Sequence, residues 1–199
     1  MPAAPTISVC LFTGEPGPRV AATLRPLREV ADEIVICADA RAADADLAAY
    51  ATVADRLFTA EFRHLEFHLQ WLHDQCSCDW ILRLDGDEVP SRALLVELPA
   101  LVRDERVAQY RIPRAWLYPD TRHWLAEVPW WPDAQLRLVR NDSRIAFDRR
   151  RARPRTALPP RDGDPAVRGA LESRTALRRA PSGPAPARRR ADGRLLPAR

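Results

Sequence analysis

The 199-residue sequence contains no lysine, so arginine carries almost all of its positive charge. The abundance of arginine, alanine and proline is typical of a GC-rich coding sequence. No apolar run approaches the roughly 20 residues that a membrane-crossing helix needs. The first 13 residues lack the charged segment of a secretory signal and are too short to form one. The sequence therefore predicts a cytoplasmic protein, with peripheral contact to a membrane surface left open.

A paired Cys-x-x-Cys motif, the usual mark of a zinc or redox site, is also missing. Cys10 and Cys37 lie within apolar, strand-like runs, which suits buried free thiols. Cys76 and Cys78 are separated by a single residue, and no second pair matches them. We therefore expect all four cysteines to be reduced and structural.

Charge and composition divide the chain near residue 148. The first 148 residues carry 16 arginines against 23 acidic residues, whereas residues 149–199 carry 15 arginines against 4. The second part also has 8 prolines and no aromatic residue. Such a segment buries too little apolar area to offset the entropy of ordering it. We predict a folded core over residues 1–147 and a disordered Arg/Pro/Ala-rich tail over 148–199.

Strand and helix patterns alternate along the first part of the chain, which argues for a mostly parallel sheet. Continuous apolar runs predict buried strands, and apolar residues at steps of three and four predict helices. The predicted strands are 6–13, 32–39, 56–59, 80–84, 107–112 and 135–139, and the predicted helices are 20–30, 43–53, 61–76 and 91–102.

The strand over 80–84 ends in the sequence Asp85-Gly86-Asp87-Glu88. Its glycine removes a Cβ atom from a crowded turn, and the two aspartates could reach one cation. Mg²⁺ and Mn²⁺ prefer such oxygen ligands, and Mg²⁺ is usually shared with substrate phosphates. The motif thus indicates a metal–diphosphate site at the carboxyl end of a strand, where open α/β sheets bind ligands. The alternative is an acidic turn that leads into a helix capped by Ser91.

Two other features have simpler explanations. His64 and His68 are four residues apart on one helix face, a spacing that can bind a metal. Because no third ligand is evident, a solvated face explains them better. The basic tail could contact nucleic acid through charge, but it has no aromatic residues for stacking on bases, so we expect no specific nucleic-acid binding.

Three strand-end motifs, TISVCLFT, DEIVICAD and WILRLDGDE, occur in this order. Together they resemble the inverting glycosyltransferases of family two, which have the GT-A nucleotide-sugar fold. The tracts WLHDQCSCDWILRLDGDEVPS and WWPDAQLRLVRND are especially similar to bacterial members. The resemblance covers roughly residues 5–147. It implies a three-layer α/β/α fold with a Rossmann-like, mostly parallel sheet. The implied activity is sugar transfer from a nucleotide-diphosphate donor to a saccharide, lipid-linked or small-molecule acceptor.

The resemblance also implies roles for individual residues. Asp87 would ligate the divalent metal, Mn²⁺ or Mg²⁺, on the donor diphosphate, and Asp85 would contact that metal or the ribose. Thr13 and Glu15 at the first strand end, with Asp39 at the second, would contact the nucleotide. This chain lacks the asparagine often found in the first loop and the double aspartate common at the second strand end.

Glycosyl transfer also needs a carboxylate base near the acceptor hydroxyl. Glu127 and Asp133 are candidates because aromatic residues that could stack on sugar rings flank both, although each could be an ordinary loop carboxylate. Trp130 and Trp131 could form a platform for the acceptor sugar, or they could simply fill the core.

The end of the sequence departs from the family pattern. Family members usually continue after an RLVRND-like strand with a Phe-Gly-x-x-His segment, but this chain has no histidine after His123. One hypothesis is that the sequence from about residue 148 is a frameshift or truncation product. Two further functional hypotheses follow: a non-catalytic nucleotide-sugar-binding remnant, and a basic nucleic-acid-associated protein.

Overall fold

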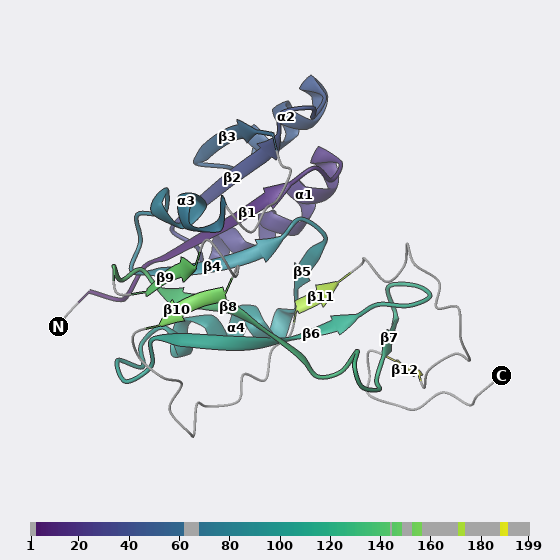
Figure 1. The fold of residues 1–199 in the computed structure, drawn as a ribbon. Coiled ribbons are helices and arrows are strands. Elements are labelled where there is room, and N and C mark those ends of the chain that lie inside the picture. Colours follow the sequence, from purple (N-terminus) through teal and green to yellow (C-terminus); the bar gives the residue numbers. More distant parts are fainter. Residues whose placement is uncertain are drawn as a thin grey trace.

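Figure 1 shows the protein as a computed structural model. The structure describes residues 3–61, 68–143, 145–148, 153–156, 171–173 and 188–190.

Three buried strands form the centre of the fold: β1 (Ile7–Thr13), β2 (Glu33–Asp39) and β4 (Trp80–Asp85). Their nearly unbroken apolar sequences suit parallel strands that are covered on both faces. β1 lies between the other two and pairs in parallel with both, so that Phe12 is opposite Cys37 on one side and Asp85 on the other. All three strands therefore end at the same edge of the sheet, as the sequence predicted.

The complete sheet has eight strands in the order β3-β2-β1-β4-β8-β6-β11-β5. Six of them run in one direction, and β8 and β5 run in the other. The added strands are β3 (Arg56–Ala60), β8 (Asp133–Arg140), β6 (Gln109–Trp116), β11 (Leu171–Ser173) and β5 (Glu88–Pro90). Two small sheets pair β9 (Ile145–Asp148) with β10 (Arg153–Thr156) and β7 (His123–Leu125) with β12 (Arg188–Arg190).

Helices cover both faces of the sheet. One core cluster joins Leu11 and Leu82 to side chains of α1 (Gly17–Leu24), α2 (Asp44–Ala51) and α4 (Arg92–Leu101). The other joins Cys10, Ile81 and Val139 to α3 (Leu69–Asp74). The predicted fold class, three α/β/α layers around a mostly parallel sheet, is confirmed.

Local chemistry explains where the helices begin and end. The helix predicted over 20–30 is split, because Pro26 lies at the start of the 3-10 helix η1 (Arg25–Glu29) and cannot continue an α-helical hydrogen-bond ladder. Ser91 caps α4 as predicted, with its Oγ accepting from the Leu94 N–H at 3.2 Å. Only the last part of the helix predicted over 61–76 can be compared, since residues 62–67, including His64, lie outside the described residues.

Several predictions concern residues or properties beyond the sheet. Three short segments of the predicted tail pair as strands β10, β11 and β12, while the rest of that tail lies outside the described residues, so its disorder stays a prediction. All four cysteines are free thiols, as expected. No helix in the described part of the chain is long and apolar enough to cross a membrane.

Candidate functional site

A cleft of about 290 Å³ lies at the carboxyl ends of β1 and β4. It brings together four of the predicted site residues, Thr13 and Glu15 after β1 with Asp85 and Asp87 after β4. Phe12, Leu69 and Leu84 form apolar parts of its wall. The parallel pairing of β1 with β4 is what places these residues side by side.

The loop after β1 is held by three contacts to Glu15. Its backbone N–H donates to Thr13 Oγ1 at 3.1 Å, and its carbonyl accepts from the buried Tyr50 hydroxyl at 2.5 Å. Its carboxylate pairs with Arg19 at 3.0 Å. The loop is therefore fixed before any ligand binds, and the Glu15 carboxylate already has a cationic partner.

The turn after β4 packs tightly against β1. A Cβ atom on Gly86 would lie 2.8 Å from Thr13 Oγ1 and 3.2 Å from the Phe12 carbonyl oxygen. Real side chains do not approach that closely, so glycine lets the Asp85–Asp87 turn reach the Thr13 loop. The predicted reason for this glycine is confirmed.

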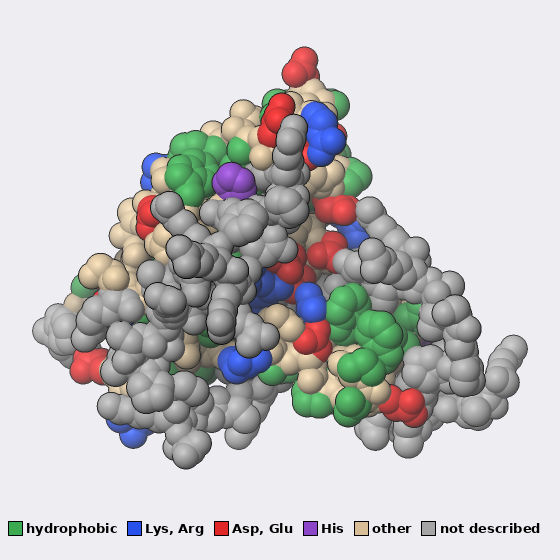
Figure 2. All heavy atoms as spheres, viewed as in Figure 1, with side chains coloured by type: hydrophobic (Ala, Val, Ile, Leu, Met, Phe, Trp, Pro, Cys, Tyr) green, Lys and Arg blue, Asp and Glu red, His purple; other side chains and the backbone are tan. Residues whose placement is uncertain are grey.

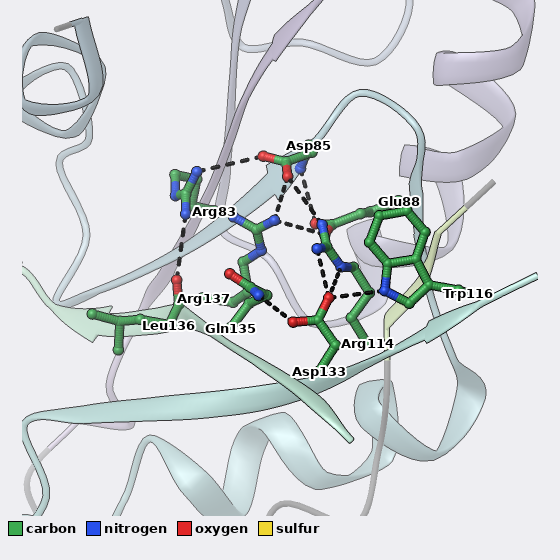
Figure 3. Close-up of polar contacts among 9 residues, drawn as sticks. All are labelled: Arg83, Asp85, Glu88, Arg114, Trp116, Asp133, Gln135, Leu136 and Arg137. Atoms are coloured by element: carbon green, nitrogen blue, oxygen red, sulfur yellow. Dashed lines mark hydrogen bonds and ion pairs between the residues drawn. The ribbon is translucent and has the colours of Figure 1, made fainter. Parts of the chain in front are cut away.

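Three arginines surround Asp85, as Figure 3 shows. Arg137 from β8 binds its Oδ2, Arg114 from β6 lies 3.8 Å from the same oxygen, and Arg83 from β4 lies 3.4 Å from Oδ1. In Figure 2, acidic and arginine side chains gather near the middle of the visible face, beside a group of hydrophobic ones. None of these arginines was among the site residues predicted from the sequence.

Glu88 is the buried centre of this network, with a side chain that is 0% exposed. Its Oε1 pairs with Arg137 at 2.6 Å and with Arg114 at 3.4 Å, and its Oε2 accepts from the Asp85 backbone N–H at 3.0 Å. Burial raises the pKa of the Glu88 carboxyl, and the charge of Arg137 opposes that effect. Glu88 thus holds the turn and both arginines in place.

Asp133 joins the same network from β8. Its Oδ2 accepts from Arg114 at 2.6 and 2.8 Å and from the Trp116 indole N–H at 2.9 Å. Burial raises the pKa of Asp133, but hydrogen bonds from Arg114, Gln135 and Trp116 outweigh it and hold the pKa below its ordinary value. The side chain is ionised at neutral pH and already has several donors.

Asp39 does not line the cleft, although β2 ends at the same edge. Arg41 donates to both carboxylate oxygens, at 3.0 and 2.7 Å, and its backbone N–H donates at 2.9 Å. These bonds lower the pKa of Asp39 to about 2. A contact with a nucleotide would require a ligand that extends past Gly14 toward β2.

The second candidate base, Glu127, is exposed, and its backbone carbonyl accepts from the N–H groups of Trp130 and Trp131. The Trp130 ring packs edge to face on Trp116 with centroids 5.4 Å apart. Trp131 packs in the same way on Trp124, at 4.6 Å. Both tryptophans are half-buried.

The carboxylates of the cleft fit a metal that is shared with a substrate. In the described ranges, no three His, Cys, Asp or Glu side chains are grouped to hold an ion by themselves. A Mg²⁺ ion that also binds phosphates needs only one or two protein carboxylates. Asp85 and Asp87 border the cleft together and match that requirement.

A sequence signal for the missed arginines does exist. Arg83 and Arg137 each stand between two leucines, in the strand sequences WILRLD and DAQLRLVR. An arginine in such a position must find a buried partner. The pattern could have marked these two residues, but it could not have named their partners.

No family model and no curated protein sequence matches this chain. Glucosyl-3-phosphoglycerate synthase from Mycobacterium tuberculosis, solved with Mg²⁺ and UDP, is 20% identical, with 56% of this chain and 44% of that chain covered and a TM-score of 0.43. The mannosyltransferase PcManGT from Pyrobaculum calidifontis, solved with GDP-Man and Mn²⁺, is 17% identical, with coverages of 56% and 36% and a TM-score of 0.43. S. aureus TarS (1–349) is 12% identical, with coverages of 72% and 50% and a TM-score of 0.48.

The matches to these three structures cover half or less of their length. At such identities and TM-scores, the similarities carry no argument about the activity of this protein. Any functional inference has to rest on the residues of the cleft.

Proposed function

We propose that this protein is a metal-dependent glycosyltransferase. It would transfer a sugar from a nucleoside-diphosphate donor to a saccharide, lipid-linked or small-molecule acceptor. One observation carries the proposal: the ends of β1 and β4 place Thr13, Glu15, Asp85 and Asp87 around one cleft. This is the edge at which α/β sheets bind nucleotides.

We assign a role to each residue from its position in the cleft. The fixed loop of Thr13 and Glu15 would contact the nucleotide, and Asp87 with Asp85 would hold the divalent ion on the donor phosphates. The ion would supply Lewis-acid neutralisation of the leaving diphosphate. Glu88 orients Asp85 by accepting the Asp85 backbone N–H and by pairing with Arg137, which also binds Asp85.

For the acceptor base we favour Asp133 over Glu127. Asp133 is linked to Asp85 through Arg114, whereas Glu127 is exposed on the tryptophan-rich loop. Trp130, which packs on Trp116 beside Asp133, would then offer a ring face to the acceptor sugar. Trp131 would extend that surface.

A second candidate function is donor binding without transfer. It is favoured by the engagement of Asp133 with Arg114, Trp116 and Gln135, which occupies the oxygens that a base would use. Incubating the protein with a nucleotide-sugar donor and a panel of acceptors separates the two functions, because only a transferase yields a glycosylated product.

Calorimetry with UDP and GDP, with and without Mn²⁺, tests the proposal on the full chain. Asp87→Asn should abolish the Mn²⁺-dependent part of nucleotide binding and leave the fold intact, because the residue lies in a turn and not in the core. Asp104→Asn removes the same charge just before β6, at the opposite edge of the sheet, and should leave nucleotide binding and its Mn²⁺ dependence unchanged. Equal nucleotide affinity in wild type and Asp87→Asn would refute the metal assignment.

A further inference from the structure

Arg83 is the least well paired arginine of the site. Its side chain is 17% exposed and borders the cleft. Its two polar contacts are long, 3.4 Å to Asp85 Oδ1 and 3.5 Å to the Leu136 carbonyl oxygen. Its buried Nε has no hydrogen-bond partner within the described part of the chain. Figure 3 shows the guanidinium at the side of the network, away from Glu88 and Asp133.

The other two arginines are better compensated. Arg137 lies 2.6 Å from Glu88 and also binds Asp85, and Arg114 lies 2.6 Å from Asp133. Within the described part of the chain, Arg83 forms one ion pair, with Asp85, and shares that carboxylate with both of them; Glu88 acts on it only through its charge. Its positive charge is therefore only partly neutralised by the protein.

Partial neutralisation matters because part of the surroundings is apolar. Phe12, Leu69 and Leu84 line the same cleft. Burial lowers the pKa of Arg83, and the nearby charge of Arg137 lowers it further. Arginine nevertheless stays protonated in proteins, so a further anionic partner would stabilise this charge. A charge-assisted bond formed in such a setting is stronger than one formed in water.

We propose that Arg83 binds an anionic oxygen group, a phosphate or a carboxylate, of the ligand that occupies this cleft. The inference rests on the proposed function and deepens it. The group would be either a donor phosphate or an acidic group of the acceptor. Arg83 has five N–H donors and makes two long contacts, so it can turn toward a ligand without breaking a short bond.

The test measures UDP, uridine and inorganic pyrophosphate binding by calorimetry on wild type, Arg83→Gln and Arg83→Lys. Arg103→Gln is the matched control, because it removes the same charge from an exposed site beyond the end of α4, at the opposite edge of the sheet. A second arm adds inorganic phosphate to UDP-saturated protein, which probes an anion site for the acceptor. Circular dichroism checks that each variant is folded.

If Arg83 contacts a donor phosphate, Arg83→Gln should weaken UDP and pyrophosphate binding by roughly tenfold to a hundredfold and leave uridine binding unchanged. If it contacts an acidic acceptor, UDP binding should hold and phosphate binding to the UDP-saturated protein should be lost. Lysine keeps the charge without the planar fork, so Arg83→Lys should lose less than the Gln variant in either case. It also serves as the test variant if Arg83→Gln does not fold.

Unchanged binding of every anion in both folded variants would overturn the inference. The proposed function fails in a different way. If wild type binds pyrophosphate through Arg83 but binds neither UDP nor GDP, the anion site stands and the nucleotide-sugar function does not. If nucleotides bind in an Mn²⁺-dependent way, and Arg83→Gln alters neither that binding nor phosphate binding to the UDP-saturated protein, the function stands and the anion site is wrong.

Discussion

The contact between Gly86 and β1 leads to a sharp prediction. The Cβ of an alanine at position 86 would lie 2.8 Å from Thr13 Oγ1 and 3.2 Å from both Thr13 Cβ and the Phe12 carbonyl oxygen. The φ of Gly86 lies outside the left-handed region that side chains avoid, so alanine is opposed by lack of space. Thr13 Oγ1 cannot move freely, because it accepts the Glu15 N–H at 3.1 Å.

The size of the effect follows from this crowding. Extra atoms forced into a packed site cost about 1–3 kcal/mol. In a domain of this size, each kcal/mol lowers the melting temperature by about 2–4 °C. We therefore expect Gly86→Ala to melt at a temperature lower by roughly 2–12 °C. Relief of the clash would also move the Asp85–Asp87 turn away from the Thr13 loop, so nucleotide affinity should fall.

Gly14→Ala is the matched control. Its Cβ would lie 3.7 Å from Asp39 Cβ, an ordinary van der Waals contact, although Gly14 borders the same cleft. Thermal unfolding followed by circular dichroism measures stability, and calorimetry with UDP and Mn²⁺ measures affinity. If Gly86→Ala melts within a degree of wild type and binds UDP equally well, the close approach of the two loops is wrong.

Two further predictions concern single side chains. Ser91→Ala should lower the free energy of unfolding, measured in urea, by about 0.5–2 kcal/mol, because the Leu94 N–H loses its capping acceptor. Ser91→Asp should restore that stability, and an unchanged urea midpoint for Ser91→Ala would contradict the cap. Asp133 has a lowered pKa in the fold, so it contributes stability that is present above the ordinary pKa of about 3.9 and is lost as the pH falls through the folded value. The stability gap between wild type and Asp133→Asn should thus be constant from pH 5 to 8 and shrink below about pH 4, and a gap that widens on acidification would refute the lowered pKa.

The sequence alone determined the central strands and the edge at which they end. Apolar runs that end in Thr13, Asp39 and Asp85 predict buried parallel strands, because every side chain in such a strand is covered. The predicted need for glycine at position 86 and for a cap at Ser91 was also correct. These features depend on neighbours in the chain or on one strand pairing, which local patterns report well.

Only the tertiary structure decided which charges meet. β8 runs antiparallel between β4 and β6, and this places Arg137 and Arg114 on Asp85 and Glu88 across 26 to 52 residues of chain. No periodicity in the sequence reports such a pairing. Asp39 differs, because its partner Arg41 is only two residues away and the contact is local. The positions of strand ends can therefore be predicted from sequence, whereas the partners of a buried charge depend on which strands become neighbours in the sheet.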